Sequence, residues 1–196
     1  MMKKYRSILY ISLTLTVIVS LMICFFISNF NNRKNINENK LKNGLIVTYY
    51  SSQHVCIKNI LPLSDELGTS LNNKSVEKNG YGYIKFSIKN NNKKASNYRI
   101  YIKKNDVSSK IIADKYIKFC LTNEYNKSYD GYDKSNIPSY SDLLALSSKP
   151  LGRLIYSGRI DGESEKVFIL RSWLSDEYEI KEDEELFDFD IFVESK

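Results

Sequence analysis

The chain has 196 residues, of which 42% are hydrophobic and 13% aromatic, enough for one membrane segment and one domain with an ordinary core. The formal net charge of +6 is unevenly divided along the chain. Residues 31–160 hold 22 basic and 10 acidic residues, whereas residues 161–196 hold 4 basic and 13 acidic residues. Because opposite charges on neighbouring strands pair favourably, we interpret this division as interleaved strands and predict no nucleic-acid partner.

The N-terminus predicts a membrane anchor. Three basic residues in the first six precede an acid-free apolar run, Ile8–Ile27, and a helix of this length spans about 30 Å, the thickness of a bilayer's hydrocarbon core. The run ends without the small residues that signal-peptide cleavage requires, which favours a retained anchor over a cleaved signal. The residues ending at Cys24 are a poor match to a lipoprotein cleavage box, because the residue before the cysteine, Ile23, is not small. A lipidated Cys24 is therefore a weaker alternative than a retained anchor.

These features predict four parts of the chain: a cytoplasmic tail (1–6), a transmembrane anchor (7–28), a polar tether (29–43) and an extracellular domain (44–196). Basic residues flank the anchor on both sides and barely decide its orientation. Long domains cross the membrane largely regardless of charge, so we expect the N-terminus inside and the C-terminal domain outside. The predicted location is the cell membrane, with a single pass through the lipid bilayer.

Alternation of apolar and polar residues with a period of two begins at Gly44 and predicts strands. In its clearest pair, Ile84, Phe86 and Ile88 alternate with polar residues before the polar turn Asn90–Lys94, and a second alternating run follows. We interpret this pair as a hairpin. The predicted strands in the first half of the domain are Leu45–Tyr50, Val55–Ile60, Tyr81–Lys89 and Tyr98–Lys103.

The second half continues the alternation, with a turn at Asp161–Ser164 and one or two helical turns at Ser141–Leu146. Short strands without a βαβ rhythm predict an all-β fold, an antiparallel jelly-roll-like β-sandwich preceded by one N-terminal transmembrane helix. The predicted strands in this half are Ile117–Thr122, Arg153–Arg159, Val167–Trp173 and Phe187–Glu194.

Five segments resemble a group of surface proteins from low-GC Gram-positive bacteria, the TasA/camelysin-like family. The strongest match is Lys166–Tyr178 (KVFILRSWLSDEY), where the family typically reads KTYxLRMWLSD. The other matching segments are Gly44–Gly68, Tyr83–Asn90 (YIKFSIKN), Tyr116–Asn123 (YIKFCLTN) and Leu154–Gly158 (LIYSG).

The resemblance implies a sandwich outside a bacterial cell, in a family of which some members build biofilm-matrix fibres by lending a strand to the next subunit. The retained anchor departs from TasA itself and argues against free fibres. The expected function is therefore a non-enzymatic, structural or adhesive cell-surface protein. Its expected partners are the bilayer and either cell-wall polymer or copies of itself. The alternatives are a wall-polymer or glycan-binding module and a camelysin-like protease.

The sequence assigns no catalytic, cofactor-binding or metal-binding residue. The only histidine, His54, lies in a strand-like run, with neither a His-Glu-x-x-His motif nor a Gly-x-Ser-x-Gly elbow to support it. Cys56 and Cys120 lack zinc-type spacing. A disulfide between them is allowed outside the cell, but if Phe119 faces the core then Cys120 faces outward, which favours two free thiols.

Three further segments allow a functional reading, and each has a simpler one. Asp130–Asn136 is rich in oxygen ligands but lacks the spaced carboxylates of a calcium loop, and we interpret it as a turn. The acidic run Glu182–Glu185 is interpreted as a solvated loop. Trp173 is a possible platform for a glycan, but we expect it to be buried with Leu170. Because the two residues are three apart, that requires a bulge near Ser172 or burial of both strand faces.

Overall fold

The computed structural model describes residues 19–20, 37–41, 43–73, 80–106, 110–128, 136–145, 152–180 and 185–196, and Asn37–Lys196 form a unit of their own. In these ranges no helix is long and apolar enough to cross a bilayer. The predicted anchor Ile8–Ile27 lies outside the described residues apart from Val19 and Ser20, and so does the predicted tether as far as Ile36.

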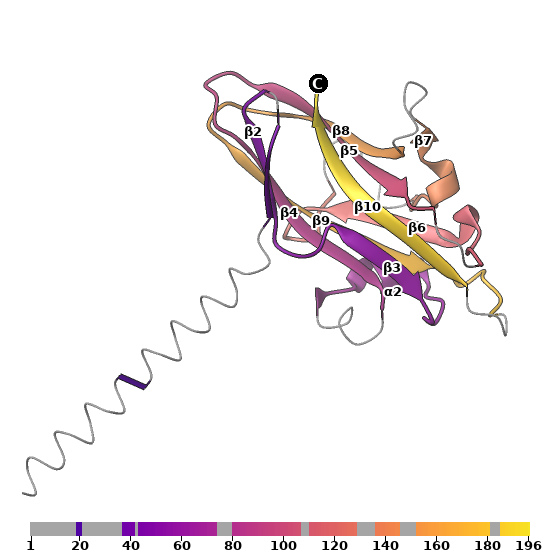
Figure 1. Ribbon diagram of the computed structural model, residues 1–196. Helices are drawn as coiled ribbons and strands as arrows, with labels where there is room; N and C mark the ends of the chain where they lie inside the picture. The colour runs from indigo at the N-terminus through magenta and orange to yellow at the C-terminus, as the bar shows by residue number, and fades with distance from the viewer. Residues whose placement is uncertain are drawn as a thin grey trace, which may run out of the picture. The chain divides into compact units, whose positions relative to one another are not determined.

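The unit is built from two five-stranded antiparallel sheets, which confirms the prediction of an all-β sandwich (Figure 1). In the first sheet the order is β1 (Asn37–Lys40), β2 (Leu45–Tyr49), β4 (Gly82–Asn90), β9 (Glu165–Leu174) and β6 (Ile117–Thr122). In the second it is β3 (His54–Lys58), β10 (Leu186–Ser195), β5 (Ser96–Lys104), β8 (Arg153–Ile160) and β7 (Leu144–Ala145).

The predicted hairpin around Asn90–Lys94 is wrong, although both of its strands exist. β4 pairs with β2 and β9, whereas β5 pairs with β10 and β8, so the connection crosses from one sheet to the other. The buried Asn90 holds this crossing: its side-chain amide donates to the carbonyls of Lys94 (2.8 Å) and Asp161 (3.1 Å). Those bonds tie the β4–β5 turn to the β8–β9 turn, which also crosses between sheets.

The domain begins earlier than the sequence predicts. Asn37–Lys40, assigned to the tether, form β1 and pair with β2 from Asn37↔Tyr49 to Lys40↔Ile46. All four side chains of β1 are exposed, so the strand is held by backbone hydrogen bonds rather than by burial. Alternation of polarity therefore offers no signal for this strand, and the start of the domain moves from Gly44 to Asn37.

The helical segments also differ from the prediction. The expected turns at Ser141–Leu146 are a single 3-10 turn, η2 (Tyr140–Asp142), followed by the short edge strand β7. Ser139 begins η2 with a capping box, in which its backbone N–H donates to the Asp142 carboxylate at 2.8 Å. A further 3-10 turn, η1 (Asp114–Tyr116), and the helix α2 (Asp65–Ser70) were not predicted.

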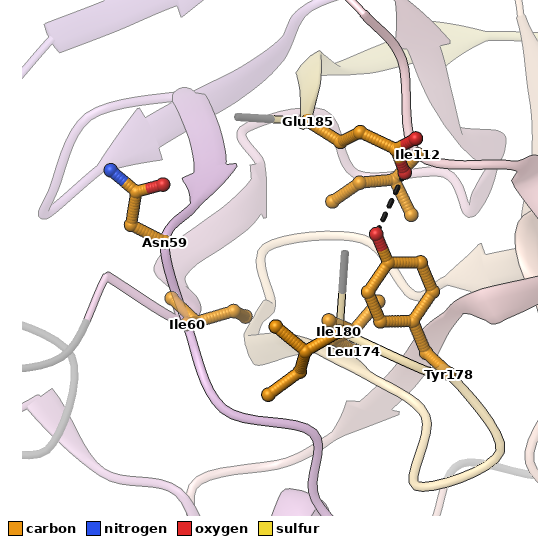
Figure 2. A pocket seen from close by; sticks show the side chains of 7 residues that line it. All are labelled: Asn59, Ile60, Ile112, Leu174, Tyr178, Ile180 and Glu185. Atoms are coloured by element: carbon orange, nitrogen blue, oxygen red, sulfur yellow. Dashed lines mark hydrogen bonds between the residues drawn. The ribbon is translucent and has the colours of Figure 1, made fainter. Parts of the chain in front are cut away.

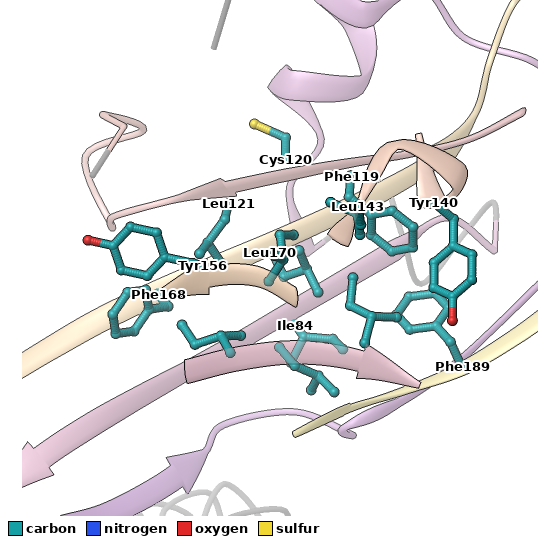
Figure 3. Close-up of a cluster of buried hydrophobic side chains, with 14 of the residues drawn as sticks. Ile84, Phe119, Cys120, Leu121, Tyr140, Leu143, Tyr156, Phe168, Leu170 and Phe189 are labelled. Carbon is teal, nitrogen blue, oxygen red and sulfur yellow. The ribbon is translucent and has the colours of Figure 1, made fainter. Parts of the chain in front are cut away.

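The core between the sheets is aromatic (Figure 3). Phe86 of β4 stacks on Phe168 of β9 with ring centroids 5.2 Å apart, and Phe119 of β6 meets Phe189 of β10 edge-on at 5.2 Å. These rings are fully buried, and offset or edge-on pairs are the arrangements that aromatic rings prefer. Figure 3 shows Cys120 pointing away from this layer, on the opposite side of β6 from Phe119 and Leu121.

Candidate functional site

Trp173 lies on the face of β9 that points away from the inter-sheet core, and it is nevertheless 0% exposed. Helix α2 covers it: a Cβ placed on Gly68 would stand 2.1 Å from an indole carbon, so only glycine fits there. The pairing of β9 runs without a shift past Ser172, so no bulge is present. Both Trp173 and Leu170 are buried as predicted, because both faces of the strand are covered.

Arg171 lies two residues before Trp173 on the same covered face and is 6% exposed. Its Nε donates to the carbonyl of Leu71 and its Nη1 to Thr122 Oγ1, both at 2.7 Å, and its guanidinium lies over the Tyr83 ring at 5.7 Å. Burial lowers the pKa of this guanidinium from its ordinary value. The residue fixes the C-terminal end of α2 to the sheet, which is a structural role.

His54 is the centre of a polar cluster on the outer face of the second sheet. Its Nδ1 lies 3.1 Å from Asp190 Oδ1 and 3.4 Å from Asp188 Oδ1, both on the neighbouring strand β10. From the other side, the Asn105 amide donates to Asp188 at 2.7 Å and to Asp190 at 3.2 Å. Half of the His54 side chain is exposed. The two carboxylates are thus bridged by the His54 ring on one side and by Asn105, the residue after β5, on the other.

This cluster does not make the thiol of Cys56 a nucleophile. Cys56 pairs with Asp188 across β3 and β10. Burial, and then the negative charge of Asp188, raise the pKa of the thiol, whereas a nucleophilic cysteine needs a lowered one. Cys56 and Cys120 are not joined by a disulfide. Cys120 faces away from the core as predicted, but it is buried, because the outer face of β6 is covered as well.

No group of His, Cys, Asp and Glu side chains among the described residues is arranged to hold a metal ion. The calcium-like segment Asp130–Asn136 lies outside the described residues apart from Asn136, so its reading as a turn stays a prediction. Of the acidic run, Glu182–Asp183–Glu184 also lie outside them. Glu185 is described, and it accepts a hydrogen bond from the Tyr178 hydroxyl at 2.7 Å rather than facing only solvent.

Two adjoining hollows lie at the end of the sandwich where β9 ends and β10 begins. The smaller encloses about 60 Å³ among Ile60, Ile112, Leu174, Tyr178 and Ile180 (Figure 2). Burial and the bond to Glu185 raise the pKa of the Tyr178 hydroxyl to about 12, so it stays a neutral donor. The larger, about 440 Å³, shares Asn59 and Ile60 with the smaller, and its other lining residues are Cys56, Lys58, Leu61, Gly80 and Tyr81.

In the second sheet the acidic strand β10 lies beside the basic strand β5. Asp190 of β10 lies opposite Lys103 of β5, and Glu194 lies opposite Arg99. This register matches the expected interleaving of the acidic C-terminal segment with the basic middle segment.

Comparisons with known proteins identify no relative. No family model, no curated protein and no solved structure matches the chain.

Sequence reasoning alone missed the His54 cluster, because its members come from strands far apart in the chain. The one available signal was the Asp188-x-Asp190 spacing within an alternating strand, which places both carboxylates on the same outer face.

Proposed function

We propose that the protein is a non-enzymatic cell-surface module with a structural or adhesive role, held in the membrane by its N-terminus. One observation carries the proposal: an acid-free apolar run of bilayer length, Ile8–Ile27, is followed within ten residues by the first strand of a two-sheet sandwich. Such a short connection keeps the domain near the membrane surface, since each extended residue spans at most about 3.3–3.6 Å.

The chemistry of the described residues supports a non-enzymatic role. The only histidine of the chain is engaged with two carboxylates through Nδ1, and the neighbouring thiol of Cys56 has a raised pKa. A cysteine or serine hydrolase needs its nucleophile within hydrogen-bond reach of the base. Among the described residues the His54 ring bonds to carboxylates, and it is the backbone N–H of His54, not the ring, that donates to the Ser52 hydroxyl at 3.1 Å. This arrangement favours a packing and surface role over a camelysin-like protease.

The proposal includes the TasA/camelysin-like resemblance and the jelly-roll-like topology that it implies. The matching segments fall on four strands of the first sheet, β2, β4, β6 and β9, and on two of the second, β3 and β8. The glycan-binding alternative loses its best candidate residue, because the Trp173 ring is enclosed by α2 and offers no face to a sugar.

Protease treatment of intact cells tests the proposal. We expect an external protease to remove the sandwich, while a fragment containing residues 7–28 stays in the membrane fraction. A chain lacking residues 7–28 should be found outside the membrane fraction. A cytosolic marker protein, intact throughout, is the control for lysis. Protection of the sandwich in intact cells, or membrane retention of the shortened chain, would contradict the proposal.

A further inference from the structure

Strand β1 leaves one edge of the first sheet open. It stands at the end of the strand order, with β2 as its neighbour on one side, and its side chains Asn37, Glu38, Asn39 and Lys40 are all exposed. Within the described ranges, no segment other than β2 and the turn leading to it bonds to its backbone. An open strand edge carries a row of N–H and C=O groups that can pair with another strand.

The other three sheet edges are less suited to pairing with a copy of themselves. The edge of β6 is covered, because Phe119 N–H donates to the carbonyl of Pro138 at 3.0 Å. Strand β7 has only two residues. Strand β3 carries Lys58 but no acidic residue that could face it from a second copy. This leaves β1 as the edge to consider.

The turn between β1 and β2 shows which backbone groups of β1 face outward. Leu41 N–H donates to the carbonyl of Leu45 (2.8 Å), and the Leu41 carbonyl accepts from Gly44 N–H (3.3 Å). Both backbone groups of Leu41 therefore point toward β2. Because this direction alternates along an antiparallel strand, the N–H and C=O groups of Glu38 and Lys40 point away from β2, to the open edge.

This alternation restricts how two copies of β1 can pair in antiparallel fashion. Within Asn37–Lys40, three registers bring outward-facing groups together: Glu38 opposite Glu38, Lys40 opposite Lys40, or Glu38 of each copy opposite Lys40 of the other. The first two place like charges opposite each other, which is unfavourable. The third pairs opposite charges twice and forms four backbone hydrogen bonds, so β1 is complementary to itself in one register.

From this complementarity we infer that the protein pairs with a second copy of itself through β1. The two first sheets join into one sheet across a twofold axis at Asn39, and the interface closes at two copies. Asn39 faces Asn39 at the axis, where each side-chain amide can both donate and accept. Each copy keeps β1 on its own β2, so no strand is exchanged.

The inference names a partner for the proposed structural or adhesive role, and it rests on that proposal only for its setting. Four residues from each copy make a small contact, and small interfaces are weak in solution. Copies held in one membrane meet at a raised effective concentration, which favours pairing through a weak contact.

A cysteine at the twofold axis tests the geometry, in the full chain reconstituted in lipid vesicles. Cys24→Ser and Cys56→Ser remove competing thiols. Facing residues at such an axis have Cα atoms about 4.5 Å apart, within the range of a disulfide. We expect Asn39→Cys to form a disulfide-linked dimer on mild oxidation. Asn37→Cys is the matched control and should not, because each Asn37 lies two residues from the axis, on opposite sides of it.

Charge reversal tests the register. Glu38→Lys or Lys40→Glu alone places like charges opposite each other twice, so self-association should weaken at least about fivefold, measured by energy transfer between labelled copies. The two variants mixed together should pair like the unaltered chain, because opposite charges again face each other. Glu124→Lys and Lys127→Glu make the same charge changes at exposed residues of another turn and should leave self-association unchanged.

Three results would overturn the inference: no disulfide-linked dimer from Asn39→Cys, an equal yield from Asn37→Cys, or no recovery when the two charge-reversed variants are mixed. Failure of pairing in a chain that passes the cell-surface protease test would leave the proposed function standing. Pairing in vesicles by a chain that fails that test would confirm the contact and contradict the cell-surface role.

Discussion

Replacing Trp173 by alanine is expected to lower the free energy of unfolding of the sandwich by about 3–5 kcal/mol. The indole is fully buried beneath α2, with its contacts made through packing: Nε1 has no hydrogen-bond partner among the described residues. Truncation would leave a cavity under the helix, because Gly68 has no side chain to fill it. The loss is a large part of the roughly 5–15 kcal/mol that stabilises a typical domain.

Leu170→Ala is the companion measurement, since Leu170 is buried on the opposite face of the same strand. Urea unfolding of residues 37–196 should show a loss of about 2–5 kcal/mol for this variant. Trp173→Phe, which retains an aromatic ring, should lose less than Trp173→Ala. If Trp173→Ala unfolds like the unaltered domain while losing retention on cell-wall glycan, the packing role is wrong and a glycan-binding module becomes the better account.

Replacing Arg171 by methionine is expected to destabilise the domain by at least about 2 kcal/mol. The substitution leaves the carbonyl of Leu71 and the hydroxyl of Thr122 without their charged donor, and bonds to charged groups contribute about 1.5–3 kcal/mol each. Desolvation of the guanidinium opposes this effect, which is why a buried charge replaced by an apolar side chain is sometimes neutral. Here two acceptors lose their donor, so we expect the loss to dominate.

Arg171→Lys is the matched control, because it keeps the charge but not the forked donor geometry. We expect it to be destabilising as well, since one ammonium group cannot reproduce bonds that leave Nε and Nη1 in different directions. Urea unfolding of both variants gives the comparison. A methionine variant as stable as the unaltered domain would show that the bonds of Arg171 only offset its cost of burial.

The strands were predictable because most of them bury a single face. β6 was predicted with its observed bounds, and β10 differs from its prediction by one residue at each end, since Phe187, Phe189 and Ile191 face the core while Asp188 and Asp190 face outward. Alternation of this kind identifies which face of a strand is buried. It does not identify the neighbouring strand, and for that reason two consecutive alternating runs were mistaken for a hairpin.

Burial of the second face of β9 and β6 could not be read from alternation. Cys120 and Arg171 are both buried on that face, and Arg171 is held there by its bond to the carbonyl of Leu71, a residue 100 positions away in the chain. The expectation that Trp173 is buried came from the family resemblance, because the alternation of polarity did not predict it. The His54 cluster depends on a separation of 136 residues, from His54 to Asp190, and no local pattern reports such a contact.

We propose that a retained N-terminal segment holds the sandwich in the membrane. Mass analysis and N-terminal sequencing of the chain extracted from the membrane fraction test this most directly. We predict a chain that begins at Met1 or Met2 and therefore keeps Ile8–Ile27, which has no small-residue cleavage site at its end. A chain that begins near Asn29, or one that begins at a lipidated Cys24, would contradict the claim.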